Sequence, residues 1–305
     1  MANIKAGAKK APKKNTAGSI RAQRFTMDVI VHSILLIMGI IWVLPFLYLV
    51  VQSFRGGDYR GMFATSFLPD SWSLRAFQDL FTKTNEINFP QMFWNTFKIA
   101  CCSCVISSFF VLAVSYCLSR VQWKLRKPYM NMAMVITLFP GFMAMTAVYI
   151  LLKTMLNMNE HPENIPLALI INYSAGSGVG FYVMKGYMDT IPKALDEAAY
   201  LDGATKWQTF IKVTLPLCKP MIVYQVITSF MGPWCDYIFA KLICGVNYDY
   251  YTVSIGLQRM LTKEFVNTWF TRFCAGSVLV AVPISILFII TQRFYQEAMS
   301  GSVKG

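Results

Sequence analysis

The stretch Glu197–Pro216, EAAYLDGATKWQTFIKVTLP, decides the fold, because it is a charged, glycine-containing segment between two long apolar runs. Thr190 and Pro192 precede it and are typical of a helix start. A threonine hydroxyl can cap free N–H groups, and proline loses nothing at the first helical position. Asp196 and Glu197 then fall near the positive end of the predicted helix dipole. The segment is therefore expected to begin with a short helix.

The rest of this stretch is predicted to turn and to form another short helix. Ala198 and Ala199 leave one face of the first helix small enough for a partner to approach its backbone. Gly203 offers the positive φ that ends a helix and turns the chain. Lys206–Val213 then forms the second helix, which Leu215-Pro216 stops. The stretch is thus expected to be a helix–turn–helix on the aqueous side of a membrane.

The composition places the rest of the chain in lipid. Hydrophobic residues make up 55% of the 305 residues and charged residues 14%, which is too apolar a balance for a soluble domain of this length. Six apolar stretches have the roughly 20 residues that a bilayer-spanning helix needs. We therefore predict an all-α membrane protein with six transmembrane helices, at Val29–Val51, Phe97–Leu118, Tyr129–Leu152, Leu167–Met184, Met221–Leu242 and Phe273–Thr291.

Charge placement gives the expected orientation, since Lys and Arg concentrate in cytoplasmic loops. With the N-terminus inside, the cytoplasmic segments hold 18 of the 28 Lys and Arg and six of the 15 acids, Asp28 included. The net charge of +13 then divides into +12 inside and +1 elsewhere. The basic balance is therefore a topology signal, and no nucleic-acid partner is implied. The first apolar run is too long for a secretory signal, so we expect an uncleaved first helix.

This topology divides the chain into five expected parts. Both termini are cytoplasmic, and membrane lipid surrounds the spans. The parts are a basic cytoplasmic tail (1–27), a first transmembrane helix (28–53), an extracytoplasmic loop (54–94), a transmembrane domain (95–292) that contains the loop 190–216, and a cytoplasmic tail (293–305).

The sequence lacks the motifs of an enzyme or a metal protein. No stretch reads GxxxxGKS or GxxxxGKT, and the glycine-rich Gly176–Gly180 has no lysine, so the chain is not expected to hydrolyse ATP by itself. The spans hold too few ionisable groups for a Ser/His/Asp or paired-carboxylate site. The eight cysteines and two histidines are not spaced as ligands, so no metal site, cofactor or disulfide framework is predicted.

Asp236 in the fifth span is the exception, because a carboxylate inside a membrane segment usually faces the bundle interior or a watery path. It is a candidate substrate-path residue together with Trp234 and Tyr237, whose rings suit stacking on sugars. Two ordinary structural roles stay open for these residues. Asp236 can reach interfacial water or pair with Lys241, and the aromatic residues can form an interfacial belt.

The order Glu197-Ala198-Ala199, Gly203, Ile211 and Leu215-Pro216 resembles the EAA loop of ATP-binding-cassette (ABC) importer permeases. The segments FYVMKGYMDTIPKALDEAA, ITSFMGPWCDYIF and FCAGSVLVAVPISILFIITQRFYQEAMSGSVKG are similar to the smaller permease subunit of maltose and maltodextrin-type carbohydrate importers. The resemblance runs from about Asn95 to the C-terminus. It implies the type I ABC importer permease fold, with cytoplasmic coupling helices that dock on an ATPase through Glu197, Ala198, Ala199, Asp202, Gly203, Leu215 and Pro216.

The resemblance also implies partners and a mechanism. A second homologous permease subunit completes the pore, two ATPase subunits bind below it, and an extracytoplasmic sugar-binding protein delivers the substrate. The chain is then a non-catalytic, multi-pass subunit in the bacterial inner membrane, and ATP hydrolysis on separate subunits drives oligosaccharide import by alternating access. A malto-oligosaccharide is the first expected substrate, with galacto-oligosaccharides as an alternative. An ion-coupled secondary transporter and a membrane scaffold are the alternatives from different functional classes.

Overall fold

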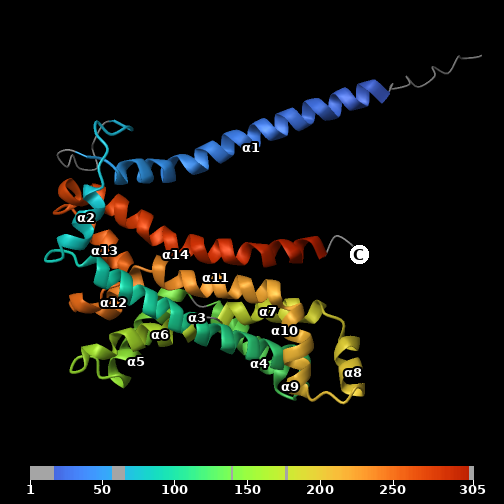
Figure 1. Cartoon of the computed structure of the whole chain (residues 1–305). Helices are drawn as coiled ribbons and strands as arrows, with labels where there is room; N and C mark the ends of the chain where they lie inside the picture. The colour runs from blue at the N-terminus through green and yellow to red at the C-terminus, as the bar shows by residue number, and fades with distance from the viewer. Residues whose placement is uncertain (1–16, 57–65, 139, 176–177, 302–305) are drawn as a thin grey trace, which may run out of the picture. The chain divides into compact units, whose positions relative to one another are not determined.

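The structure is a computed structural model, and it describes residues 17–56, 66–138, 140–175 and 178–301. Helices dominate this described part, which contains no strand and one isolated bridge, Arg55 to Trp72. The all-α class is therefore confirmed (Figure 1). The helices are α1 (Ala17–Ser53), α2 (Arg75–Thr82), α3 (Phe89–Arg120), α4 (Arg126–Thr137), α5 (Gly141–Met155), η1 (Pro162–Asn164), α6 (Ile165–Ala175), α7 (Gly178–Thr190), α8 (Lys193–Leu201), α9 (Lys206–Thr209), η2 (Phe210–Thr214), α10 (Leu215–Leu217), α11 (Lys219–Cys235), α12 (Ile238–Cys244), η3 (Tyr248–Tyr250), α13 (Val253–Met260) and α14 (Val266–Gly301).

Four helical stretches of the described residues are long and apolar enough to cross a membrane, and the number rises to six when each of two bent helix pairs counts as one span. The stretch Phe25–Ser53 has a mean hydropathy of 2.8, and its most apolar part is unburied. Exposed apolar side chains along this helix are what a lipid-facing span requires. The chain divides into two compact units, the first of which contains α1 as far as Leu49.

The first helix begins earlier than predicted. α1 begins at Ala17, inside the predicted tail 1–27 and before the predicted helix start at residue 28. Residues such as Ala, Arg and Gln in this part favour a helix, and hydropathy alone does not register them. Residues 1–16 of the predicted tail lie outside the described residues.

The second predicted span also begins earlier, at Phe89 rather than Phe97. The Oδ1 of Asn88 accepts a hydrogen bond from the Gln91 N–H at 3.3 Å, and Pro90 occupies the first turn. Both features are ordinary helix-start chemistry. The predicted extracytoplasmic loop 54–94 therefore contains α2 and the first turn and a half of α3.

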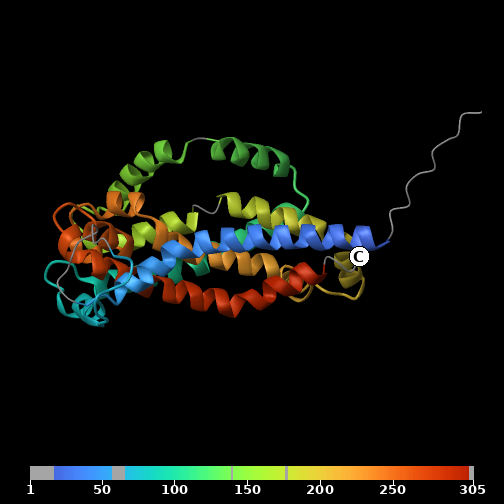
Figure 2. The same cartoon turned by 90° about the horizontal axis from the view of Figure 1, so that it is seen from above.

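The third predicted span, Tyr129–Leu152, is broken in the structure. It consists of α4 and α5, whose axes are bent by 100° over a short break that includes residue 139, which lies outside the described residues. Figure 2 shows the two helices as an arch. Pro140 directly precedes α5 and cannot donate a backbone hydrogen bond, which explains why the helix does not continue.

The fourth predicted span, Leu167–Met184, falls within the stretch Pro162–Thr190, which is long and apolar enough to cross a membrane. It contains parts of α6 and α7 and also residues 176–177, which lie outside the described residues. The fifth span, predicted over Met221–Leu242, stops at Cys235, because Asp236 adopts an extended conformation with φ −82° and ψ 115°. α12 follows as a separate short helix.

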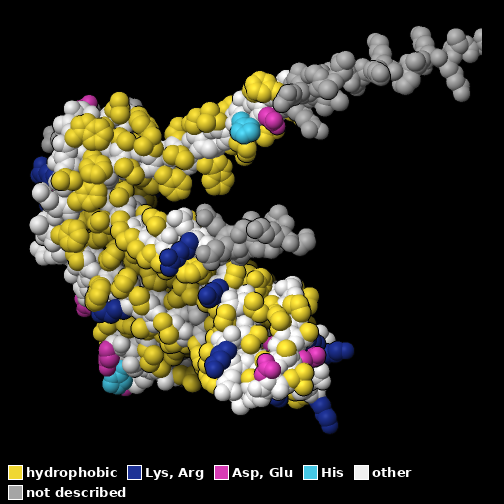
Figure 3. All heavy atoms as spheres, turned by 45° about the vertical axis from the view of Figure 1, so that its right-hand side comes forward, with side chains coloured by type: hydrophobic (Ala, Val, Ile, Leu, Met, Phe, Trp, Pro, Cys, Tyr) yellow, Lys and Arg dark blue, Asp and Glu magenta, His cyan; other side chains and the backbone are white. Residues whose placement is uncertain are grey.

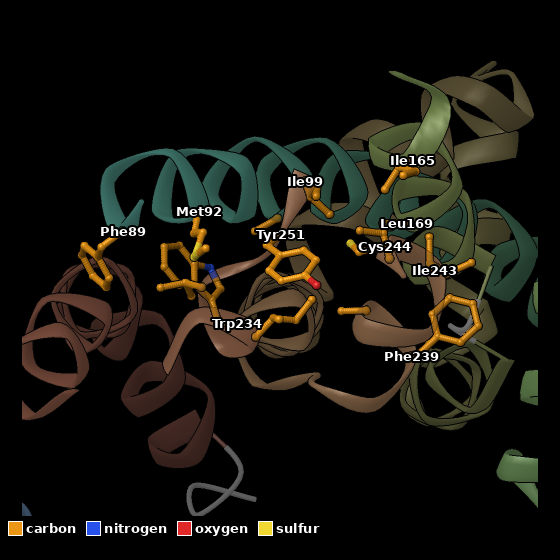
Figure 4. Packing of buried hydrophobic residues seen from close by; sticks show 14 of the residues in the cluster. Phe89, Met92, Ile99, Ile165, Leu169, Trp234, Phe239, Ile243, Cys244 and Tyr251 are labelled. Carbon is orange, nitrogen blue, oxygen red and sulfur yellow. The ribbon is translucent and has the colours of Figure 1, made fainter. Parts of the chain in front are cut away.

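The core of the second unit forms around α3, which packs mainly on α11, α7 and α6, while α11 also packs on α14. Figure 4 shows the larger of its two apolar clusters from close by. Among its members that are at most 5% exposed are residues of α3, α6, α11, α12 and the segment before α13: Phe89, Met92, Ile99, Ile165, Leu169, Trp234, Phe239 and Tyr251.

A buried ion pair ties α14 to α2 at one end of this unit. The Nη2 and Nε of Arg272 donate to Asp79 Oδ2 at 2.8 Å and 3.2 Å. The Nε1 of Trp269, one turn earlier, donates to Glu86 at 3.0 Å. Both partners lie in the segment predicted as the extracytoplasmic loop, so this segment is held to the last span by charged side chains.

Candidate functional site

The predicted helix–turn–helix is present, and Gly203 makes its turn. α8 ends at Leu201, and Gly203 follows with a φ of +81°, as predicted for this position. Thr205 then caps α9: its hydroxyl accepts from the Gln208 N–H at 3.2 Å, and the Gln208 side chain accepts from the Thr205 N–H at 2.8 Å. This reciprocal capping box fixes the start of the second helix. We call residues 193–217, from α8 to α10, the coupling loop.

The start of the coupling loop differs from the prediction. Thr190 still belongs to α7, where its hydroxyl donates to the Tyr187 carbonyl at 2.7 Å, and it does not cap α8. Pro192 precedes the first helical residue, Lys193, and α8 has no side-chain cap. The predicted helix therefore begins at Lys193. Pro192 separates it from α7, because its ψ of 129° lies outside the helical region.

The end of the coupling loop differs too, because Leu215-Pro216 does not stop the second helix. The chain continues from α9 through a π-helical turn over Phe210–Thr214 and then through α10 as far as Leu217. Pro216 is the second residue of α10 and lies just after the π-helical turn, where the regular hydrogen-bond ladder of the helix is already interrupted. The helix breaks only at Cys218, and the next helix, α11, is bent by 80° from it.

The predicted docking residues lie mostly on the surface of the coupling loop. Five of them are exposed: Glu197, Ala198, Asp202, Gly203 and Pro216. The other two, Ala199 and Leu215, are half-buried. Among the large apolar side chains of this loop, the most exposed are Leu201, by 89%, and Trp207, by 63%, and the sequence pattern did not predict them. In Figure 3, several Lys and Arg side chains stand around the end that carries α8 and α9. Exposed apolar side chains among charges are typical of a protein–protein contact.

One buried ion pair anchors the coupling loop to the bundle. The Nε of Arg120, at the end of α3, lies 3.1 Å from Asp196 Oδ2 on α8, and the two side chains are 4% and 8% exposed. The Nη2 of Arg120 also donates to the carbonyls of Met188 and Ile191, each at 2.9 Å. One guanidinium thus joins the end of α3, the end of α7 and the start of α8. Sequence reasoning placed Asp196 near the helix start and missed its partner.

Two further contacts join α3 to its neighbours at the same end. The Tyr116 hydroxyl donates to the Lys206 carbonyl of α9 at 3.2 Å. The Ser119 hydroxyl donates to Asp189 Oδ1 at 2.6 Å, and Lys185 pairs with Oδ2 of the same carboxylate at 2.5 Å. The coupling loop is therefore held to α3 on both of its halves.

The three predicted substrate-path residues lie in three different environments. Trp234 is 4% exposed and packs edge-on against Phe93 with ring centroids 5.1 Å apart. Asp236 lies at the helix break, where its carboxylate accepts from the Tyr173 hydroxyl at 2.8 Å and from the Phe239 N–H at 3.1 Å. Tyr237 lines a surface hollow of about 500 Å³ with residues of α12, η3 and α13.

The pairing of Asp236 with Lys241 is absent among the described residues. Lys241 instead donates to the Gly245 carbonyl at 2.9 Å and to the Tyr251 hydroxyl. Asp236 acts as an N-terminal cap for α12 and holds Tyr173 of α6, so it ties two helices together at the break in the fifth span. No group of three His, Cys, Asp or Glu side chains in the described part of the chain is placed to hold a metal ion.

A second hollow, of about 370 Å³, lies between the spans and was not predicted. Seven of its ten lining residues carry a side-chain hydroxyl or amide, although the helices that form it are apolar overall. The lining residues are Ser107 of α3, Asn172 and Tyr173 of α6, Gly180 and Val183 of α7, and Tyr224, Gln225, Thr228, Ser229 and Gly232 of α11. The sequence feature that could have indicated this hollow is the set of polar residues on one face of α11, namely Tyr224, Gln225, Thr228 and Ser229.

Comparison with known proteins assigns the family. Residues 110–301 match the family described as "Binding-protein-dependent transport system inner membrane component". This chain belongs to that family. A relative, the "Maltodextrin transport system permease protein MalD" of Streptococcus pneumoniae, is 30% identical over 288 residues, which cover 94% of this chain and 99% of the relative.

Further relatives carry related names. The "Galactooligosaccharides transport system permease protein GanQ" of Bacillus subtilis is 29% identical over 94% of this chain and 99% of its own length. The "Maltose/maltodextrin transport system permease protein MalG" of Vibrio vulnificus is 33% identical over 86% of this chain and 91% of its own length. The expected resemblance to ABC importer permeases of the carbohydrate type is therefore confirmed.

A solved structure supports the fold. A chain of a bacterial ABC transporter that imports the acidic polysaccharide alginate aligns with a TM-score of 0.69 at 19% identity, over 90% of this chain and 98% of that chain. The chain is thus an inner-membrane permease component with an ABC importer fold, which is a non-catalytic role.

Proposed function

We propose that this chain is the permease subunit of a binding-protein-dependent ABC importer that moves a neutral oligosaccharide into the cell. The family match over residues 110–301 carries this proposal, and the names of the relatives, maltodextrin and galactooligosaccharide permeases, supply the substrate class. The chain acts beside a second homologous permease subunit, above two ATPase subunits and below an extracytoplasmic sugar-binding protein. All ATP hydrolysis takes place on the ATPase subunits.

The coupling loop is the surface on which an ATPase docks. Glu197 and Asp202 offer exposed carboxylates, and Ala198 and Ala199 keep the adjoining face of α8 small, so the ATPase can approach closely. Leu201 and Trp207 add apolar contact area at the tip. Gly203 makes the turn, and Leu215 and Pro216 continue the helix toward the fifth span. Closure of the ATPases then moves the loop, and Arg120 passes that movement to α3.

The orientation follows from the charge distribution and from this docking. The coupling loop, both termini and the segment Arg120–Lys127 face the cytoplasm, whereas 247–270 faces the opposite side. There, the hollow beside Tyr237 includes Lys241 and Arg259, polar groups that suit contact with the binding protein. Trp234, Asp236 and Tyr237 neighbour the sugar path, with Asp236 acting through Tyr173.

The docking is tested with Glu197→Arg in the complete transporter. The reversed charge is expected to abolish co-purification of the ATPase from detergent and to abolish uptake, while membrane insertion stays normal. Glu160→Arg is the matched control, since Glu160 is an exposed glutamate outside the coupling loop. Undiminished co-purification and uptake by Glu197→Arg are the results that contradict the docking assignment.

The substrate is tested by uptake of labelled maltotriose and labelled β-1,4-galactotriose into proteoliposomes that hold the whole transporter and its binding protein. We expect ATP-dependent uptake of maltotriose. The 29% identical galactooligosaccharide relative is the specific reason to measure the second sugar in parallel. ATP-independent uptake driven by an ion gradient contradicts the importer assignment.

A further inference from the structure

The polar hollow between the spans is unusual in its position. It lies between α3, α6, α7 and α11, and Gln225, one of its lining residues, is only 6% exposed and sits near the middle of α11. Polar side chains inside a membrane span are unfavourable unless they face other polar groups or a water-filled cavity. Seven lining residues carry a side-chain hydroxyl or amide: Ser107, Asn172, Tyr173, Tyr224, Gln225, Thr228 and Ser229.

Hydrogen bonds hold the amide of Gln225 in one orientation. Its Nε2 donates to Ser107 Oγ at 3.2 Å and to Ser229 Oγ at 2.8 Å. A Cβ atom at Gly180 would lie only 2.9 Å from Gln225 Oε1, so the glycine leaves the room that this orientation needs. Both donors of the amide are thereby used within the protein. Its Oε1 accepts no hydrogen bond from any described residue and stays available to a ligand.

Two more groups of the lining are available for hydrogen bonds. The side-chain amide of Asn172 and the hydroxyl of Tyr224 have no hydrogen-bond partner within the described ranges 17–56, 66–138, 140–175 and 178–301. Asn172 offers two donors and an acceptor, and Tyr224 offers one donor and one acceptor. Tyr173, in contrast, uses its hydroxyl on Asp236, which fixes the position of its ring. The hollow thus combines unused amide and hydroxyl groups with two aromatic rings.

The charge of the lining restricts the ligand further. The residues that line this hollow include no Lys, Arg, His, Asp or Glu. A carboxylate ligand in such a site has to give up its hydration without gaining a cationic partner, which is strongly unfavourable. Hydroxyl groups are satisfied by amides and hydroxyls, and the ring faces of Tyr173 and Tyr224 suit the apolar faces of a sugar ring.

We infer that this hollow is a subsite of the translocation path that binds a hexose unit of a neutral oligosaccharide through Asn172, Tyr224 and Gln225. The inference rests on the proposed function, and it adds the residues and the uncharged class of sugar. It also sets this chain apart from the alginate importer whose fold it shares, since that protein carries an acidic polysaccharide.

A lipid tail is the competing occupant, and the lining argues against it. The chain has another hollow, of about 510 Å³, between α3, α4, α6 and α7, and apolar side chains such as Ile106, Phe110 and Leu167 make most of its lining. An acyl chain suits that apolar hollow. It would leave the polar groups beside Gln225 without partners.

The test uses Asn172→Ala and Tyr224→Phe in the complete transporter, with maltotriose as the probe, or β-1,4-galactotriose if only this sugar is taken up. Each change removes one side-chain partner, so sugar imported per ATP hydrolysed is expected to fall by about threefold to tenfold at a saturating amount of sugar-loaded binding protein. The ATPase rate stimulated by that binding protein is expected to stay unchanged. A purely structural defect lowers both quantities together. Asn159→Ala, on an exposed asparagine outside the hollow, is the matched control.

Tyr224→Phe keeps the ring and its volume, and Tyr224 is 40% exposed, so this variant is expected to assemble normally. If the wild-type transporter imports neither sugar, the proposed function is wrong and the subsite is rejected with it. If the wild type imports a sugar and both variants keep its ratio of sugar to ATP, the subsite alone is wrong. A lipid occupant gives this second result.

Discussion

Replacing Arg120 with leucine is expected to release the coupling loop from the bundle. Arg120 holds three elements at once, through Asp196 of α8 and the carbonyls of Met188 and Ile191 near the end of α7. The leucine fills part of the space and removes the charge and the donors. It therefore leaves the Asp196 carboxylate buried beside apolar atoms without a cation.

The size of the effect follows from the burial of the pair. Removal of one partner from a buried ion pair costs about 3–5 kcal/mol, because the remaining charge is left uncompensated. Asp196 is 8% exposed but borders a surface hollow of about 360 Å³, so we expect the lower end of this range. About 3 kcal/mol corresponds to roughly a hundredfold shift toward states in which α8 is detached.

The assay is hydrogen exchange of the coupling loop, followed by mass spectrometry on the purified whole transporter. The amides of α8 are expected to lose most of their protection in Arg120→Leu, while those of α3 near Ile99 keep theirs. The ratio of sugar imported to ATP hydrolysed is expected to fall in the same variant. Lys193→Leu is the control, because Lys193 is an exposed cation on α8 itself.

The double variant Arg120→Leu/Asp196→Leu separates charge from packing. Removal of both charges is expected to recover part of the lost protection, since no uncompensated carboxylate remains. Unchanged hydrogen exchange of α8 in Arg120→Leu refutes the reasoning. A double variant whose α8 amides are even less protected than those of Arg120→Leu refutes it as well.

Three further predictions concern the turn, the topology and the helix break. Gly203→Pro is expected to abolish uptake without loss of membrane insertion, because proline holds φ near −65° and the turn requires +81°; normal uptake would contradict the role of the turn. Lys124→Cys, in a background without the eight native cysteines, is expected to resist an impermeant thiol reagent in intact cells, and labelling from outside would overturn the topology. Asp236→Ala is expected to lower the free energy of unfolding of the transporter by about 1–3 kcal/mol, because the Tyr173 hydroxyl and the Phe239 N–H lose their acceptor. Asp249→Ala, at an exposed aspartate, is its control, and a changed half-saturating sugar concentration at normal stability would point to direct sugar contact instead.

The sequence predicted the spans from their length and apolar character, whereas a hydropathy window alone does not locate their breaks. A hydropathy window averages over about 20 residues, so a single proline or an extended residue hardly changes it. Pro140 and Asp236 break two such runs in the structure. Asp236 was singled out because of its charge, but its role as a cap for α12 depends on a break that the window hides.

Within the coupling loop, the feature that depends on local backbone chemistry was predicted correctly and the features that depend on distant partners were not. The positive φ of Gly203 follows from the residue type alone. The end of α7 does not, because its last carbonyls are satisfied by Arg120, about 70 residues earlier in the chain. α7 therefore runs on through Thr190, whose hydroxyl bonds the Tyr187 carbonyl and does not cap α8.

The polar hollow could not be predicted from the sequence either, because it depends on contacts between residues that are far apart in the chain. Ser107 and Gln225 are 118 residues apart and carry no motif, and only the packing of α11 on α3 brings them within 3.2 Å. Each of them alone is an ordinary polar residue in a span. The hollow takes its character from Gln225 Oε1, which accepts no hydrogen bond from a described residue once the amide nitrogen has bonded Ser107 and Ser229.

The single helix α3 connects the polar hollow with the coupling loop. Ser107 and Arg120 lie on this one helix, 13 residues and therefore about 20 Å apart. At Arg120 the contacts are buried and charged, so breaking them is costly and we expect the coupling loop to move with the helix as a unit. At Ser107 the hydrogen bond from Gln225 is neutral and contributes about 1 kcal/mol, so we expect that a sugar hydroxyl can replace it during movement. Strong contacts at one end and exchangeable contacts at the other are what a helix requires to carry force from an ATPase to a sugar without holding that sugar in place.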